Sequence, residues 1–279
     1  MVDDVAAAVR HCEKQFGWGP FHRFKAAIAE SSYKRWRGEK LTEVALGMAG
    51  KVQVEFLHVH KGCDTTADYQ AEYGTGFQHL GIHSCDRDEA LQRLQGLGAK
   101  VNELNEFPGV RIAFVDVPTG PGMFEILEPT AEMANNKQLD NSHKVDHSRS
   151  ALLGIDRASI VTADMDAALS FYAEAFGWGY TRAETATLLY GHKKTTVRRY
   201  LCVAGALQLE LIEPANGTDD PYSRHLRRGT HGLIHAGGTV DGELPSGESL
   251  YCEWQETGER FALYTWAGGE NGLQIRLAN

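Results

Sequence analysis

The chain has 279 residues, of which 42% are hydrophobic and 23% are charged, a composition that can bury a core and excludes intrinsic disorder. Its formal net charge of −9 disfavours nonspecific binding to nucleic acid or to an anionic membrane surface. Five scattered cysteines without a CxxC pair, an acidic N-terminus and the absence of a run of roughly 20 apolar residues predict a cytoplasmic protein with reduced thiols.

The first predicted element is a helix over residues 4–15, where Val5, Ala8, Val9 and Cys12 follow helical spacing. Gly17 ends it. A second helix is predicted over Asp86–Leu97, before Gly98. Short apolar runs predict strands at Val44–Met48, Lys51–Leu57, Leu80–Ser84, Ile112–Asp116 and Phe124–Leu127.

An internal repeat links the two halves of the chain. The segment Phe16-Gly17-Trp18-Gly19 recurs as Phe176-Gly177-Trp178-Gly179, at an offset of 160 residues, and the helix before it recurs over residues 164–175. Strands are predicted in the second half at Arg199–Val203, Leu207–Ile212, Gly232–Ala236, Phe261–Thr265 and Leu273–Leu277. A repeat of this kind indicates two folding units built to a common plan.

The polar, aromatic-free stretch Ala131–Ser150 is the predicted linker between these units. We therefore expect one domain over residues 1–130 and a second over residues 151–279. The order of elements predicts two βαβββ modules in each domain, and thus an α+β fold with four modules.

Three predicted strands of the first half carry an ionisable residue among apolar neighbours: Glu55, His79 and Glu125. Alternate residues of a strand share a face, so each side chain points to a core, to solvent or into a cleft. Burial of isolated carboxylates is costly, whereas a shared divalent cation would compensate them. The alternative is that all three are outward-facing polar positions.

The second half repeats this pattern in part. Glu210 and His231 stand in the same local sequences as Glu55 and His79, and the histidines four residues further on, His83 and His235, also recur. Gln274 stands where Glu125 is expected. This recurrence favours the metal interpretation over that of unrelated surface positions.

These runs resemble the vicinal oxygen chelate superfamily, which contains glyoxalase I, methylmalonyl-CoA epimerase, fosfomycin and bleomycin resistance proteins and extradiol dioxygenases. The first half is most similar to the epimerase-like glyoxalases. The resemblance implies tandem βαβββ modules that form U-shaped mixed sheets, in which the first and last strand of each module supply one metal ligand. It assigns Glu55, His79 and Glu125 as ligands of a divalent metal (Mn, Co, Ni, Zn or Fe), with Glu55 or Glu125 also acting as general base.

The resemblance also implies a fourth ligand, a histidine on a strand before the first helix. In the second half this place is held by Arg157, and the offset of 160 puts its counterpart upstream of Met1. The first module is thus expected to lack its opening strand, and the site to be completed by upstream residues, solvent or another chain. Arg157, Glu210, His231 and Gln274 form a degenerate second site, in which Arg157 is expected to pair with Glu210 because a guanidinium cannot ligate a metal.

The resulting hypothesis is a metal-dependent isomerase, epimerase or lyase that acts on a small oxygenated metabolite or an acyl-CoA by enolate-stabilised proton transfer. Lys34, Arg35 and Arg37 are candidate phosphate contacts for the latter. Two alternatives are a non-enzymatic small-molecule binder and an extradiol-type dioxygenase, whose C-terminal signature resembles Phe261–Gln274. A small-molecule substrate is expected in every case, neither nucleic acid nor membrane is expected as a partner, and a homodimer is an open possibility.

Overall fold

The computed structural model describes residues 1–34, 36–107, 109–119, 123–130, 154–190, 193–215, 219–229, 232–241, 250–256, 259–265 and 272–278. In the first half the elements are α1 (Val5–Phe16), β1 (His22–Tyr33), β2 (Trp36–Ala49), β3 (Val52–Lys61), α2 (Thr65–Tyr73), β4 (Leu80–His83), α3 (Arg87–Gly96), β5 (Lys100–Phe107), β6 (Val110–Asp116) and β7 (Met123–Pro129). In the second half they are β8 (Arg157–Val161), α5 (Met165–Phe176), β9 (Tyr180–Tyr190), β10 (Lys193–Ala204), β11 (Leu207–Pro214), α6 (Pro221–Arg227), β12 (Leu233–Asp241), β13 (Leu250–Glu256), β14 (Glu259–Thr265) and β15 (Gly272–Ala278).

The repeated sequence forms the same local structure twice. Asp4 accepts a hydrogen bond from the Ala7 amide at the start of α1, and Asp164 accepts one from the Ala167 amide at the start of α5. Both helices end at a glycine in the left-handed region, Gly17 with φ 65° and Gly177 with φ 69°. Aspartate caps and left-handed glycines fix helix ends in the sequence itself, so these boundaries were predictable.

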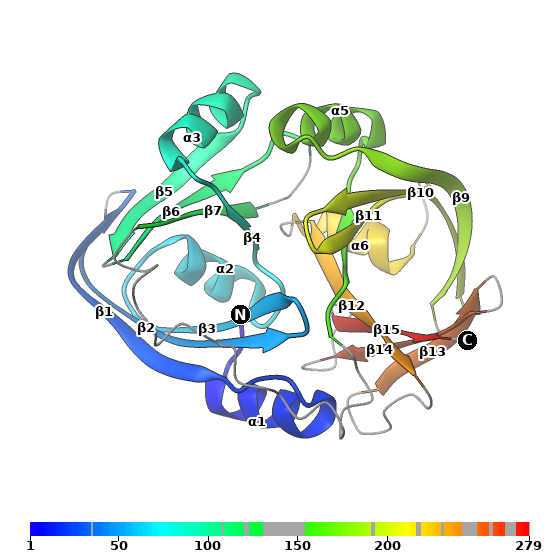
Figure 1. Ribbon diagram of the computed structural model, residues 1–279, viewed down its shortest axis with the longest axis horizontal. Helices are drawn as coiled ribbons and strands as arrows, with labels where there is room; N and C mark the ends of the chain where they lie inside the picture. The colour runs from blue at the N-terminus through cyan, green and yellow to red at the C-terminus, as the bar shows by residue number, and fades with distance from the viewer. Residues whose placement is uncertain are drawn as a thin grey trace.

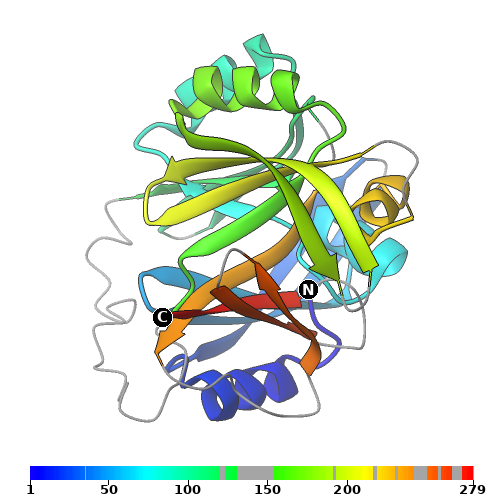
Figure 2. The same ribbon diagram turned by 90° about the vertical axis from the view of Figure 1, so that its right-hand side faces the viewer.

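The two halves differ in how their strands join. The second half has one eight-stranded mixed sheet in the order β13-β14-β15-β12-β8-β11-β10-β9 (Figure 2). Its opening strand β8 makes the connection, because it pairs parallel with β11 and antiparallel with β12. The first half has two separate sheets, β1-β2-β3 and β4-β7-β6-β5.

The first residues of the chain lie beside β3 as the end of β8 lies beside β11 in the second half. The Val2 amide donates to the Leu57 carbonyl at 3.0 Å, as the Thr162 amide donates to the Ile212 carbonyl at 2.9 Å. The predicted α+β fold with tandem βαβββ modules is therefore confirmed.

The four modules pack in pairs that cross the halves. One core joins α3 and β7 to α5 and β8, and its buried residues include Leu94, Phe124, Ile160 and Phe171. Figure 1 shows α3 and α5 side by side above it. A second core surrounds α1 and includes Ile155 from the second half. The halves are thus held together by apolar burial.

We predict that Phe124→Ala destabilises the protein by about 3–5 kcal/mol, the usual cost of deleting a buried aromatic ring. Phe124 is 1% exposed and its ring contacts those of Tyr172, Phe176 and Trp178. The control is Phe24→Ala, at a position 39% exposed. Free energies of unfolding in urea test the prediction, and equal losses for the two variants would contradict the shared core.

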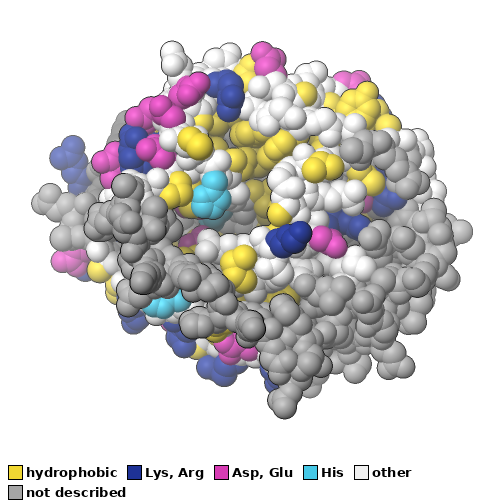
Figure 3. Space-filling view, in the orientation of Figure 1, with side chains coloured by type: hydrophobic (Ala, Val, Ile, Leu, Met, Phe, Trp, Pro, Cys, Tyr) yellow, Lys and Arg dark blue, Asp and Glu magenta, His cyan; other side chains and the backbone are white. Residues whose placement is uncertain are grey.

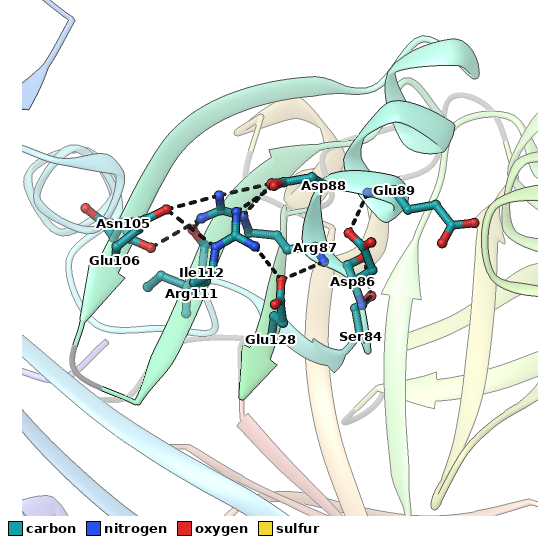
Figure 4. A network of polar contacts seen from close by, with 10 residues as sticks. All are labelled: Ser84, Asp86, Arg87, Asp88, Glu89, Asn105, Glu106, Arg111, Ile112 and Glu128. Carbon is teal, nitrogen blue, oxygen red and sulfur yellow. Dashed lines mark hydrogen bonds and ion pairs between the residues drawn. The ribbon is translucent and has the colours of Figure 1, made fainter. Parts of the chain in front are cut away.

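A polar network fastens α3 to its sheet (Figure 4). Glu128 on β7 accepts from the Arg87 amide at the first position of α3 and from Arg111 on β6, and Arg111 also contacts Asp88. The second half has an equivalent set around α5: Glu213 accepts from the Met165 amide and from Arg198, which also contacts Asp166. The repeat therefore extends to side-chain contacts that no sequence pattern indicated.

Several elements were not predicted from the sequence. Two of them are helices α2 and α6, which begin after the buried caps Asp64 and Asp220. Strands β1, β5, β9 and β13 were not predicted, and the predicted linker 131–150 lies outside the described residues. Within the described ranges, no helix has both the length and the apolar character needed to span a membrane.

Candidate metal centre

The fold brings Glu55, His79 and Glu125 together from three segments. Glu55 lies on β3, Glu125 on β7, and His79 directly precedes β4. Strands β4 and β7 are parallel, with Gly81 opposite Glu125, so the entrance to β4 is held beside that carboxylate. His79 lies just outside the strand that was predicted to carry it.

The ligand atoms of these residues converge. His79 Nε2 lies 3.4 Å from Glu55 Oε2 and 3.5 Å from Glu125 Oε2, and all three atoms lie within 4.8 Å of one another. The side chains of His79 and Glu125 are 10% and 11% exposed, whereas that of Glu55 is 28% exposed. The site is thus closed on the side of β4 and β7 and more open beside β3.

The charge balance of the cluster is set by its two carboxylates. Burial alone lowers the pKa of His79, but hydrogen bonding and charge attraction from Glu125 and Glu55 outweigh it and raise the pKa to about 9. The two acidic groups thus create a site that favours a cation between them. A proton on His79 and a bound metal ion are two ways to supply that cation.

A buried glutamine orients the imidazole. Gln78 Oε1 lies 2.7 Å from His79 Nδ1, and Gln78 is 3% exposed. Because an amide oxygen only accepts, Nδ1 carries the hydrogen, and Nε2 faces the carboxylates, to which it donates a proton or beside which it offers its lone pair to a metal. The edge-on ring of Phe114, 5.3 Å away between centroids, supports the same orientation. No sequence pattern singled out Gln78, although it immediately precedes His79.

The donor set suits a divalent metal. Imidazole and carboxylate bind zinc, iron, manganese, cobalt and nickel, with bonds of about 2.1 Å that place two ligands at most about 4.2 Å apart. The distances from His79 Nε2 to Glu55 Oε2 and Glu125 Oε2, 3.4 and 3.5 Å, lie within that limit. Glu55, His79 and Glu125 would therefore hold such an ion and leave its remaining positions to a substrate or to solvent.

The corresponding site of the second half is built differently. Glu210 is 3% exposed; its Oε1 lies 3.0 Å from Arg199 Nη1 and its Oε2 accepts a hydrogen bond of 2.7 Å from Ser159. Burial raises the pKa of Glu210, but Arg199, Arg157, Ser159 and His235 lower it further than burial raises it. The direct ion pair is thus made by Arg199, and the predicted pairing with Arg157 was wrong, because the Arg199 side chain on β10 reaches Glu210 Oε1 and Ser159 on β8 bonds the other oxygen.

The other predicted positions are distributed as follows. The side chains of His231 and Gln274 lie outside the described residues. His83 is exposed at the end of β4, whereas His235 is 1% exposed and its ring meets that of Tyr222. Lys34 follows β1 and forms a 2.5 Å ion pair with Asp68. Arg37 is exposed on β2, and Arg35 lies outside the described residues.

The face of the molecule in Figure 3 is hollowed near its middle, and hydrophobic side chains gather along the upper part of the hollow. Small-molecule sites commonly combine such apolar walls with a few convergent polar groups.

Comparison with solved structures places the fold. A mutant of 4-hydroxymandelate synthase from Streptomyces coelicolor aligns with a TM-score of 0.64 at 14% identity, over 100% of this chain and 90% of that one. The 2,3-dioxygenase LapB from Pseudomonas sp. KL28 aligns with a TM-score of 0.54 at 10% identity, over 100% and 89%. A hypothetical protein from Staphylococcus aureus aligns with a TM-score of 0.51 at 11% identity, over 93% of this chain and 90% of that one.

No curated protein matches the sequence. Two family models do match, one over residues 1–114 and one over residues 154–242, and both describe the glyoxalase/bleomycin resistance protein/dioxygenase superfamily. Together with the fold and its repeated modules, these matches show that the chain belongs to the glyoxalase/bleomycin resistance protein/dioxygenase superfamily, the vicinal oxygen chelate proteins.

Proposed function

We propose that the protein is a divalent-metal-dependent isomerase, epimerase or lyase whose site lies in its first half. The observation that carries this proposal is the convergence of Glu55, His79 and Glu125 within 4.8 Å. A bound divalent ion supplies Lewis acidity, which polarises a substrate carbonyl and stabilises the negative charge that develops when the neighbouring carbon loses a proton.

The chain's own residues account for the proton transfer. Glu55 is the more exposed of the two carboxylates, so it is the better placed to take a proton from a substrate carbon and return it. Glu125 and His79 are less exposed and are proposed to serve as metal ligands. Gln78 keeps the imidazole in one tautomer. The proposed substrates are a small oxygenated metabolite and an acyl-CoA thioester, both of which carry an acidic carbon beside a carbonyl.

Metal content and proton exchange together test this proposal. Protein purified without chelator is expected to contain close to one equivalent of Mn, Co, Ni, Zn or Fe. In D₂O, a panel of α-hydroxyketones and acyl-CoA thioesters is screened by mass spectrometry for uptake of one deuterium beside the carbonyl. Uptake should stop after chelation, return with added metal and be lost in Glu55→Gln. A metal-free protein whose ligand binding is unchanged by chelator would instead identify a non-enzymatic binder.

A second candidate is ring cleavage by an extradiol-type dioxygenase, which the structural similarity to LapB favours. Two histidines and one carboxylate are the usual ligands of non-haem Fe(II) oxygenases. The cluster in the first half has one histidine and two carboxylates, and Arg157 holds a ligand position in the second. Oxygen consumption with catechol and Fe(II) or Mn(II), dependent on His79, would favour this candidate over the first.

A further inference from the structure

Arg157 lies beside the buried ion pair of the second half. It is the first residue of β8 and stands opposite Gln208 on β11, while Ser159, two residues on, stands opposite Glu210. Alternate residues of a strand share a face, so Arg157 is on the face that carries Ser159 and Glu210. Arg199 reaches Glu210 from β10 on the same face.

Both oxygens of Glu210 already have partners. Arg199 pairs with Oε1 and Ser159 donates to Oε2. Arg157 is half-buried, and within the described part of the chain its side chain makes no hydrogen bond or ion pair; its Nε is buried without an acceptor. A buried guanidinium N–H without an acceptor is costly, because the group loses its hydration without compensation.

Arg199, not Arg157, forms the ion pair with Glu210, so the charge of Arg157 has no ion-pair partner among the described residues. The adjoining part of the sheet is closed by an apolar cluster with α6 that includes Val161, Ile212 and Tyr222. The local environment therefore leaves one positive charge for which the chain supplies no described counter-ion.

We propose that Arg157, with Arg199 beside it, forms a binding site for a small-molecule oxyanion, a carboxylate or a phosphate group. The planar guanidinium presents its donors in a fork that matches such groups. The site goes beyond the proposed metal chemistry and is independent of it. The first half has no equivalent of Arg199. Its place there is held by Val44, which pairs with Leu57 as Arg199 pairs with Ile212. One half thus supplies a cation site and the other an anion site.

Calorimetric titration of the chelator-treated, gel-filtered full-length protein tests the site, with inorganic phosphate and butyrate as probes. Without metal, the acidic cluster of the first half has no affinity for anions. Arg157→Gln should weaken binding by about tenfold or more, the usual value of a charged hydrogen bond, and Arg157→Lys by less. The control Arg198→Gln should change nothing, since Arg198 bonds Glu213 and Asp166 beside α5.

Glu210→Gln provides a readout that a purely structural role of Arg157 would not give. Removal of this carboxylate takes away the negative charge beside Arg157, so phosphate and butyrate should bind several-fold more tightly. Preference for phosphate or for butyrate identifies which oxyanion the natural ligand carries. No binding of either probe by the folded wild-type protein at about 20 mM, roughly the weak limit of a specific site, would overturn the proposal. Equal binding by wild type and Arg157→Gln would do the same.

Discussion

Glu125→Gln is expected to lower metal affinity by about 100-fold, with near-complete loss of metal from the purified protein. The substitution keeps the shape of the side chain but removes the charge that faces His79 at 3.5 Å. An amide oxygen is a much weaker ligand than a carboxylate, and loss of outer groups alone costs 10–100-fold in metal sites. Elemental analysis and titration with Zn²⁺ or Mn²⁺ measure the effect.

The matched control is Gln274→Ala, since Gln274 holds the corresponding place in the second half. It should leave metal content unchanged, because Arg157 and the Arg199–Glu210 ion pair disfavour a cation there. Equal losses in the two variants would refute the assignment of the metal to the first half.

The largest effect on stability is expected from Lys40→Met. Lys40 on β2 is 8% exposed and forms ion pairs with Asp64, the cap of α2, and with Glu103 on β5, which are 0% and 6% exposed. Glu103 also accepts from the amide and hydroxyl of Thr65. Loss of the ammonium leaves two buried carboxylates without their cation, which costs about 3–5 kcal/mol.

The control for Lys40→Met is Lys61→Met. Lys61 pairs with Glu39 at the surface, where the two side chains are 61% and 65% exposed, so solvent screens the pair and its contribution to stability is small. Urea unfolding of both variants gives the comparison. A loss below about 1 kcal/mol for Lys40→Met would show that the buried network is not a major source of stability.

The same network predicts a pH dependence. Burial raises the pKa of Glu103, but Lys40, Thr65 and Asn105 lower it more, so the folded pKa lies below its ordinary value of 4.5. A depressed carboxyl pKa gives stability that is fully present above the unfolded pKa and is lost as the pH falls through the folded pKa. Below about pH 4.5, stability should fall more steeply in wild type than in Lys40→Met.

The alternation of polar and apolar residues along the strands was enough to predict the three candidate metal ligands. Glu55, His79 and Glu125 each stood out because an ionisable residue interrupted an apolar run, and the repeat supplied a second copy for comparison. The groups that bond to them did not stand out. Gln78 bonds His79, and Arg199 bonds Glu210 in place of the predicted Arg157; both contacts depend on distances that only the packed sheets define.

The sequence by itself determined the duplicated α+β plan, because helix caps, left-handed glycines and alternation are local signals that each half carries. Tertiary structure alone decided that β8 joins the second half into one sheet, that the first half keeps two sheets, and that modules pair across the halves. Those outcomes depend on contacts between residues far apart in the chain, and no local pattern specifies which distant partner a strand or helix will meet.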